Sequence, residues 1–133
     1  MAYKVYRVEH HGNGQNNHVQ IFIETEPDGS GNESGSGRIY HVTGNILTGM
    51  MLETKLAQRP ESFGTFVQGS KKLVGHIEPA RVDQFKRICE AIPPPGAQLK
   101  LNGQLKDPSI PIRRCGDWVD QVLEWTRAEG LLD

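Results

Sequence analysis

The chain has 133 residues, of which 36% are hydrophobic and 23% charged, as is usual for one globular domain. We therefore expect a single domain over residues 1–133. Fifteen basic and sixteen acidic side chains leave a net charge of −1, which excludes the basic surface that supplies affinity for nucleic acid. No apolar run approaches the ~20 residues of a membrane span, and the first residues lack a secretory core. A cytoplasmic protein without a membrane span is expected.

The cysteine and histidine spacings argue against bound metal. Two cysteines are too few for a disulfide framework, and in the cytosol we expect both to stay reduced. Neither Cys-x-x-Cys nor His-x-x-x-His occurs, and the side chains of the adjacent His10 and His11 diverge in regular structure. We expect no metal site and no cofactor.

The first part of the chain predicts antiparallel strands. Residues 3–9 alternate enough for one strand, and residues 18–24 predict a second, with apolar side chains on one face and His18 on the more polar face. Residues 38–43 predict a third strand, which ends near His41. The Gly/Ser-rich segment between them predicts a flexible hairpin loop at about 27–37. Because a strand follows this loop, it does not match a phosphate-binding P-loop.

Further strands are predicted at 50–56 and 73–77, with a weaker one at 63–67. A helix then begins near Pro79, because proline is tolerated in a first helical turn. Its apolar residues recur at spacings of three and four, namely Val82, Phe85, Ile88, Cys89 and Ile92. This pattern predicts that Cys89 is a buried structural residue.

The last helix is predicted from roughly residue 115 to 129, after a short extended run at 98–101. Trp125 lies off its apolar stripe, which consists of Cys115, Trp118, Val119, Val122, Leu123 and Thr126. An exposed Trp125 would favour a partner-binding role. Strands followed by helices indicate an α+β fold, with an antiparallel sheet packed against two helices.

Cys115 is the candidate nucleophile because it opens that last helix. A helix start presents unpaired backbone N–H groups and the positive end of the helix dipole, and Arg113 and Arg114 add positive charge. These conditions favour the thiolate form of cysteine. The same N–H groups could stabilise the oxyanion of an acyl-transfer intermediate.

Two histidines are candidates for the rest of the site. A hairpin of strands 18–24 and 38–43 would place His18 and His41 at neighbouring positions. His18 would then take the proton of Cys115, and His41 would hold the His18 ring in its useful tautomer. Set beside this interpretation, a cysteine on an apolar helical stripe is more often a core residue, and a histidine at a strand end is more often simply solvated.

The order of these segments resembles the circularly permuted papain-like fold of the NlpC-type superfamily, and most of all its lecithin:retinol acyltransferase-like group. The resemblance is carried by His18-Val19-Gln20-Ile21-Phe22-Ile23, by Gly37-Arg38-Ile39-Tyr40-His41-Val42-Thr43-Gly44 and by Cys115-Gly116-Asp117-Trp118-Val119. It implies a permuted papain-like arrangement in which Cys115 is the nucleophile, His18 the base and His41 the third polar residue. Arg114 departs from the pattern, since family members usually have Asn there.

The resemblance implies a small cytosolic thiol hydrolase or acyltransferase that uses a Cys-His-His site. Membrane-acting members carry a hydrophobic C-terminal tail, whereas residues 131–133 follow the helix here, so we expect a small-molecule or peptide acyl substrate: an amide, a peptide or a (thio)ester. The alternative is a non-catalytic binding or interaction domain of the same fold, in one form a homodimer. An unrelated α+β fold with a structural or regulatory role is the third class, because fold does not imply activity.

Overall fold

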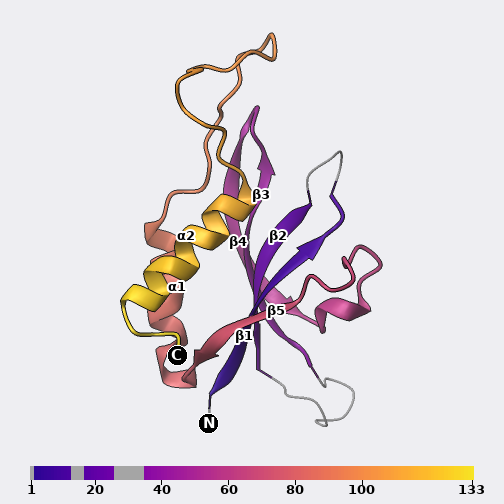
Figure 1. The fold of residues 1–133 in the computed structure, drawn as a ribbon, viewed down its shortest axis with the longest axis vertical. Helices are drawn as coiled ribbons and strands as arrows, with labels where there is room; N and C mark the ends of the chain where they lie inside the picture. The colour runs from indigo at the N-terminus through magenta and orange to yellow at the C-terminus, as the bar shows by residue number, and fades with distance from the viewer. Residues whose placement is uncertain (1, 13–16, 26–34) are drawn as a thin grey trace.

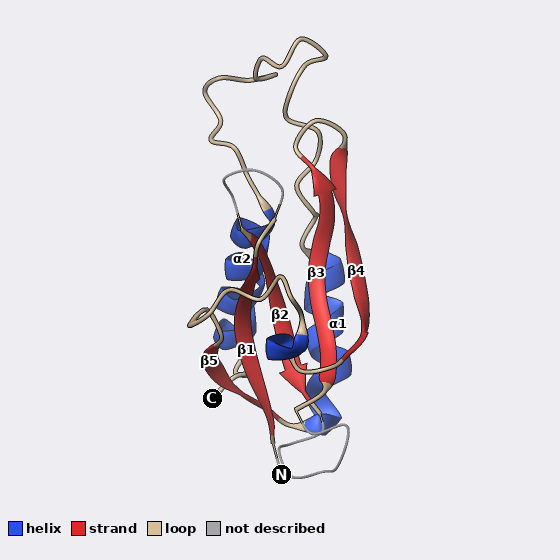
Figure 2. Cartoon of the chain, turned by 90° about the vertical axis from the view of Figure 1, so that its right-hand side faces the viewer, coloured by secondary structure: helices blue, strands red, loops and turns tan. Residues whose placement is uncertain are grey.

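The computed structural model describes residues 2–12, 17–25 and 35–133. Strands in these ranges form a five-stranded antiparallel sheet in the order β4-β3-β2-β1-β5. They are β1 (Tyr3–His10), β2 (His18–Glu24), β3 (Gly37–Asn45), β4 (Gly49–Ala57) and β5 (Lys72–Ile77). Helices α1 (Val82–Ala91) and α2 (Cys115–Ala128) cover one face of this sheet (Figures 1 and 2). The predicted α+β class, with an antiparallel sheet and two helices, is confirmed.

Alternation along the strands gives the sheet two distinct faces. On the helix face, residues of β1, β2 and β3 pack with α1 and α2 into the main core, which includes Val5, Val19, Ile21, Ile23, Tyr40 and Val42. On the opposite face, which we call the outer face, a smaller cluster contains Val8, Phe22, Ile39 and Phe66. Because side chains alternate with a period of two, His18 and His41 belong to the outer face. Helix-face and outer-face residues therefore lie on opposite sides of one sheet.

Helix α1 follows a short 3-10 turn, η3 (Pro79–Arg81), as the proline in the first turn predicted. It buries Phe85, Ile88 and Cys89 against the core. The predicted structural role of Cys89 agrees with its burial. Burial raises the pKa of the Cys89 thiol to about 12, because the charged thiolate is poorly solvated in an apolar interior.

Two predicted segments pair less than expected, and a third lies mostly outside the described residues. Residues 63–67 follow the 3-10 turn η2 (Pro60–Ser62), and their pairing is limited to one isolated bridge between Phe66 and His10. The extended run at 98–101 is likewise reduced to a bridge between Leu99 and Leu105. Both segments are too short and too exposed to bury a strand face. Of the predicted loop at 27–37, residues 27–34 lie outside the described residues, and Gly37 already belongs to β3.

Residues 93–114 form a long arm that leads into α2 and extends beyond the tip of the β3–β4 hairpin (Figure 1). Its base is held by Gln98, which accepts a hydrogen bond from the Arg113 backbone N–H at 2.6 Å and donates one to the Arg113 carbonyl at 2.7 Å. The Gln98 backbone N–H also donates to the Ile46 carbonyl at 2.7 Å. Arg113, two residues before Cys115, is thereby connected to the hairpin tip. Within the described residues, no helix is long and apolar enough to cross a membrane.

The two tryptophans of α2 provide a test of this packing. Trp118 is fully buried and donates its indole N–H to the Ile92 carbonyl at 3.0 Å, whereas Trp125 is 41% exposed. We expect Trp118→Ala to lower the free energy of unfolding by roughly 3–5 kcal/mol, because it leaves a cavity under the helix. Trp125→Ala on the same helix should cost less than about 1 kcal/mol. Urea denaturation of both variants measures this, and equal losses would contradict the assigned helix face.

Candidate functional site

The site is built where strands β2 and β3 separate. Their ladder runs from Glu24 and Gly37 to Ile21 and Tyr40, although β2 continues to His18. On its other side, β2 pairs Val19 with Glu9 of β1.

The orientation of Glu9 determines where the Val19 backbone points. The Glu9 N–H donates to Ser70 Oγ at 3.2 Å and its carbonyl accepts from the Val67 N–H at 3.1 Å, so both groups face away from β2. In an antiparallel pair the backbone groups of opposed residues both point inward or both point outward. The Val19 N–H therefore points toward β3, beyond the end of the ladder, and lacks a strand partner.

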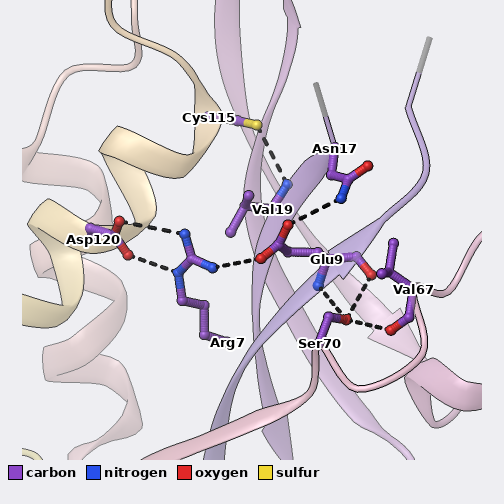
Figure 3. Close-up of polar contacts among 8 residues, drawn as sticks. All are labelled: Arg7, Glu9, Asn17, Val19, Val67, Ser70, Cys115 and Asp120. Carbon is purple, nitrogen blue, oxygen red and sulfur yellow. Dashed lines mark hydrogen bonds and ion pairs between the residues drawn. The ribbon is translucent and has the colours of Figure 1, made fainter. Parts of the chain in front are cut away.

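Cys115 supplies the partner for this N–H. The Val19 N–H donates to Cys115 Sγ at 3.5 Å (Figure 3). The thiol is brought there by the start of α2, where Gly116 packs so closely that an added Cβ would lie 3.2 Å from the Val19 side chain. Glycine at 116 thus allows the helix start to approach the strand.

The first turn of α2 is capped by Asp117, whose Oδ2 accepts a hydrogen bond from the Arg114 N–H at 2.8 Å. The Arg114 guanidinium has no acceptor atom with which to return the bond, so the cap is one-sided. In the first turn, the Asp117 N–H donates to the Arg114 carbonyl at 3.1 Å. The N–H groups at a helix start generally lack an intrahelical acceptor, and an oxyanion held by those of Cys115 and Gly116 stays a prediction.

An ion-pair network fixes α2 to the sheet beside the thiol (Figure 3). Arg7 of β1 donates to both carboxylate oxygens of Asp120, at 2.8 and 3.4 Å, and to Glu9 Oε2 at 3.1 Å. Asn17 donates to the other Glu9 oxygen at 3.2 Å. A guanidinium held by two carboxylates has a defined orientation. The network therefore sets the position of the helix that carries Cys115.

The thiol opens onto a cavity of about 660 Å³. Residues of β1, β2, α2 and the β3–β4 hairpin line it, and His18, Cys115 and Arg114 lie on its wall together with the Arg7 network. Its size is within the range of ligand-binding clefts, roughly 300–1,000 Å³. We call it the thiol cavity.

His18 and His41 are in direct contact, as predicted from the hairpin. His18 Nε2 lies 2.7 Å from His41 Nδ1, and His41 Nε2 lies 2.7 Å from Glu53 Oε1 on β4. His41 is opposite Glu53 in the β3–β4 register. It lies inside β3 rather than near its end, because that strand continues to Asn45. The three side chains form a continuous hydrogen-bonded chain.

The direction of this chain follows from its carboxylate end. Glu53 can only accept, so His41 donates through Nε2 and its Nδ1 accepts from His18 Nε2. In the neutral His18 ring, Nδ1 then carries the free lone pair. Burial, with His41 nearby, lowers the pKa of His18 to about 4, and burial also lowers the pKa of His41 despite Glu53. The hydrogen bond from His41 lowers the pKa of Glu53. All three shifts agree with neutral rings and an ionised carboxylate.

Cys115 does not share this chain. In the part of the chain that the structure describes, no hydrogen bond joins Sγ to either imidazole, because the thiol lies on the helix face and the rings on the outer face. Cys115 and His18 nevertheless line the same cavity, where β2 begins. The Cys115 sulfur contacts the backbone N–H of the residue that follows His18. The structure therefore brings the two predicted residues to one cavity without pairing their side chains.

Sequence reasoning missed Glu53, Arg7 and Asp120. Glu53 is found only once the β3–β4 register is known, and 113 residues separate Arg7 from Asp120. A charge that alternates with apolar residues on a strand was the one available signal for Arg7. Among the described residues, no group of three or more His, Cys, Asp or Glu is placed to hold a metal ion.

The lowered histidine pKa values predict that acid destabilises the protein. In the unfolded chain histidine titrates near 6.5, so between pH 6.5 and about 4 the unfolded state binds more protons than the folded state, in which the pKa of His18 is about 4. The free energy of unfolding should be highest above pH 6.5 and should fall on acidification, by up to ~1.4 kcal/mol per pH unit for each proton. His18→Gln should make the fall between pH 7 and 5 shallower in urea denaturation. An unchanged slope would contradict the assignment.

Comparisons with known proteins place the whole described fold in one family. Searches of curated proteins and of solved structures found no match. A family model matches residues 5–133, which contain both helices and all five strands except the first two residues of β1. The chain belongs to the family of unknown function DUF6540.

Proposed function

We propose that this protein is a small cytosolic thiol hydrolase or acyltransferase that acts on an amide, peptide or (thio)ester. Cys115 is the nucleophile, His18 the general base and His41 the residue that orients it. Glu53 extends the predicted Cys-His-His site by a fourth member. The proposal is carried by one observation: the Glu53–His41–His18 chain leaves a lone pair on His18 Nδ1, and His18 lines the cavity that contains the Cys115 thiol.

The reaction proceeds in two steps. His18 Nδ1 takes the proton of Cys115, whose sulfur attacks the carbonyl carbon, and the backbone N–H groups at the start of α2 bind the developing oxyanion. The tetrahedral intermediate collapses, the C–N, C–O or C–S bond breaks, and His18 returns the proton to the leaving group. Water or an amine then attacks the acyl-enzyme carbonyl while the same base accepts its proton; the C–S bond to Cys115 breaks, the acid or amide product leaves, and His18 returns the proton to the sulfur.

The catalytic step requires the thiol and His18 to engage each other. His18 is the first residue of β2, beyond the end of the ladder with β3 although still opposite His10 of β1, so a rotation of its side chain breaks no backbone hydrogen bond between β2 and β3. Catalytic hydrogen bonds in ligand-free enzymes are often loose and tighten when substrate binds. A carbonyl seated in the thiol cavity would replace the Val19 N–H as the nearest neighbour of Sγ.

The order of parts supports the permuted papain-like arrangement that we propose for this fold. A histidine begins β2, a second histidine lies in β3, and the cysteine opens a later helix that packs on the same sheet. The carboxylate of Glu53 contributes the negative charge that stabilises an imidazolium during turnover. Arg114 departs from the pattern; its backbone N–H donates to Asp117, and the residue also lines the thiol cavity.

A second candidate function is a non-catalytic binding or interaction domain, in one form a homodimer. It is favoured by the Val19 N–H bond to Sγ and by the separation of thiol and rings on opposite faces. In this interpretation Cys115 is a packing residue, and the thiol cavity binds a ligand without reaction. Dependence of Cys115 reactivity on His18 distinguishes the two functions.

Alkylation of Cys115 tests the proposed pair. We expect iodoacetamide at pH 6 to 7 to label Cys115 and spare Cys89, because burial and a pKa of about 12 protect the latter thiol. Cys115 is also more exposed than Cys89, and exposure alone would make it react faster. The decisive result is therefore that His18→Ala slows the labelling of Cys115 by about tenfold or more. Mass spectrometry of the labelled peptides gives both rates.

His76→Ala is the matched control, because this histidine pairs with Asp133 away from the site. It should leave the rate of Cys115 labelling unchanged. Glu53→Gln should give an intermediate rate, since it removes the charge that orients His41. If Cys115 reacts equally in wild type and His18→Ala, or stays inert at pH 6 to 8, the binding domain is the correct function.

Acylation tests the chemistry directly. Incubation with p-nitrophenyl acetate should release a burst of nitrophenolate and leave one acetyl group on Cys115, detected in the intact mass and located by peptide mapping. Cys115→Ala should abolish the burst, and His18→Ala should slow it by roughly 10²- to 10⁴-fold. Cys89→Ala, in the core, should retain it. Acetylation that survives Cys115→Ala would refute the assigned nucleophile.

A further inference from the structure

The outer face of the sheet contains a cavity separate from the thiol cavity. It has a volume of about 240 Å³ and is lined by side chains of β1, β2, β3 and the 63–65 segment, among them His10, Gln20, Ile39, His41 and Phe63. We call it the outer cavity. Apart from His18, which borders both, its lining residues differ from those of the thiol cavity.

The outer cavity is lined by polar side chains that are almost fully buried. His10, Gln20 and His41 are 7%, 4% and 6% exposed. Such groups cost free energy in a folded protein unless each finds a partner. His10 has two, since one ring nitrogen lies 2.8 Å from Gln20 Nε2 and the other 3.1 Å from Thr65 Oγ1. His41 also has two, His18 and Glu53.

Gln20 is the exception among these three residues. Its amide has two polar ends, and His10 engages one of them. Whichever way the amide is oriented, the end that does not contact His10 has no partner in the described part of the chain. Gln20 is one of the residues that line the outer cavity. As placed, Nε2 donates to His10 and Oε1 is the unused acceptor. Because no fully buried side-chain N or O atom of the described residues lacks a partner, the unpaired end of the Gln20 amide is open to the cavity, where a ligand atom can reach it.

We propose that the outer cavity is a binding site for a small uncharged molecule that presents an N–H or O–H group to Gln20 and a flat apolar part to Phe63 and Ile39. A primary carboxamide attached to a small ring fits this description, because its amide also complements Gln20 in the reversed orientation. The Phe63 ring already stands edge-on to His10, with centroids 5.9 Å apart. It offers an aromatic wall beside the polar end of the cavity.

Charge and size define the class of ligand. Burial lowers the pKa of His10 and of His41, so both rings are neutral, and Lys55 on the cavity wall pairs with Glu53 at 3.4 Å. The rim charges thus compensate each other and select neither anions nor cations. The volume corresponds to about eight water molecules at ~30 Å³ each. A single small ring with one polar group is the size that fits.

This site does not depend on Cys115 acting as a nucleophile. Its polar groups are supplied by β1, β2 and β3, and a ligand there would be detected at His10 and Gln20 whether or not the thiol reacts. Binding can therefore fail while acylation succeeds, or succeed while acylation fails. The two proposals are tested separately.

Titration with benzamide, followed by ¹H–¹⁵N spectra of the histidine rings and of the Gln20 side-chain amide, tests the site. We expect saturable shifts at His10, His18 and Gln20. Gln20→Met keeps the length of the side chain but removes the amide, and it should weaken binding by about tenfold, the effect of one lost hydrogen bond of ~1.4 kcal/mol. Gln68→Met, at an exposed glutamine, is the matched control and should bind as wild type.

Two further ligands complete the experiment. Toluene lacks the polar group and benzoate carries a charge, so both should shift these resonances less than benzamide at equal concentration. Linear shifts without saturation would show that the cavity holds water only. Equal binding of toluene, or full binding by a folded Gln20→Met variant, would overturn the role of Gln20. In either case the proposed site would be withdrawn.

Discussion

The hydrogen-bond ladder between β2 and β3 ends at Ile21 and Tyr40, although both strands continue beyond that point. Three features depend on this early end. The Val19 N–H is released from strand pairing and meets Cys115 Sγ, the start of α2 can approach the sheet, and the first residue of β2 can border cavities on both faces. A ladder that continued to His18 would give the Val19 N–H a strand partner in place of the thiol.

Because side chains alternate along each strand, the two faces of the sheet carry different functional groups. Arg7, Glu9 and Val19 face the helices, so ion pairs and thiol lie together there. Their neighbours in sequence, His10 and His18, face the other way and are linked to Gln20 and His41. The residues that hold α2 in place are thus separated by the backbone of the sheet from the hydrogen-bonded chain of Glu53, His41 and His18.

Sequence patterns were informative where the physics is local. Alternation located β2 and the apolar stripe located α2, because burial of a strand face or a helix stripe leaves a fixed period in the sequence. The 63–67 segment was wrong as a strand because propensity does not reveal whether a neighbour is present. The contact of His18 with His41 followed from hairpin pairing. Glu53 and Asp120 depend on register and on long-range packing, which one sequence does not encode in readable form. Strand alternation places His18 on the outer face, away from the helix that carries Cys115. Only the structure shows that one cavity reaches both residues.

His18 is the residue that both cavities share. A molecule in either cavity that turns its imidazole alters the surroundings of a molecule in the other. Thermodynamic linkage makes such an effect equal in both directions: if occupancy of the outer cavity changes the affinity of the thiol cavity for its ligand by some factor, occupancy of the thiol cavity changes the affinity of the outer one by the same factor. If both proposed sites bind their ligands, the His18 side chain couples the two faces of the sheet.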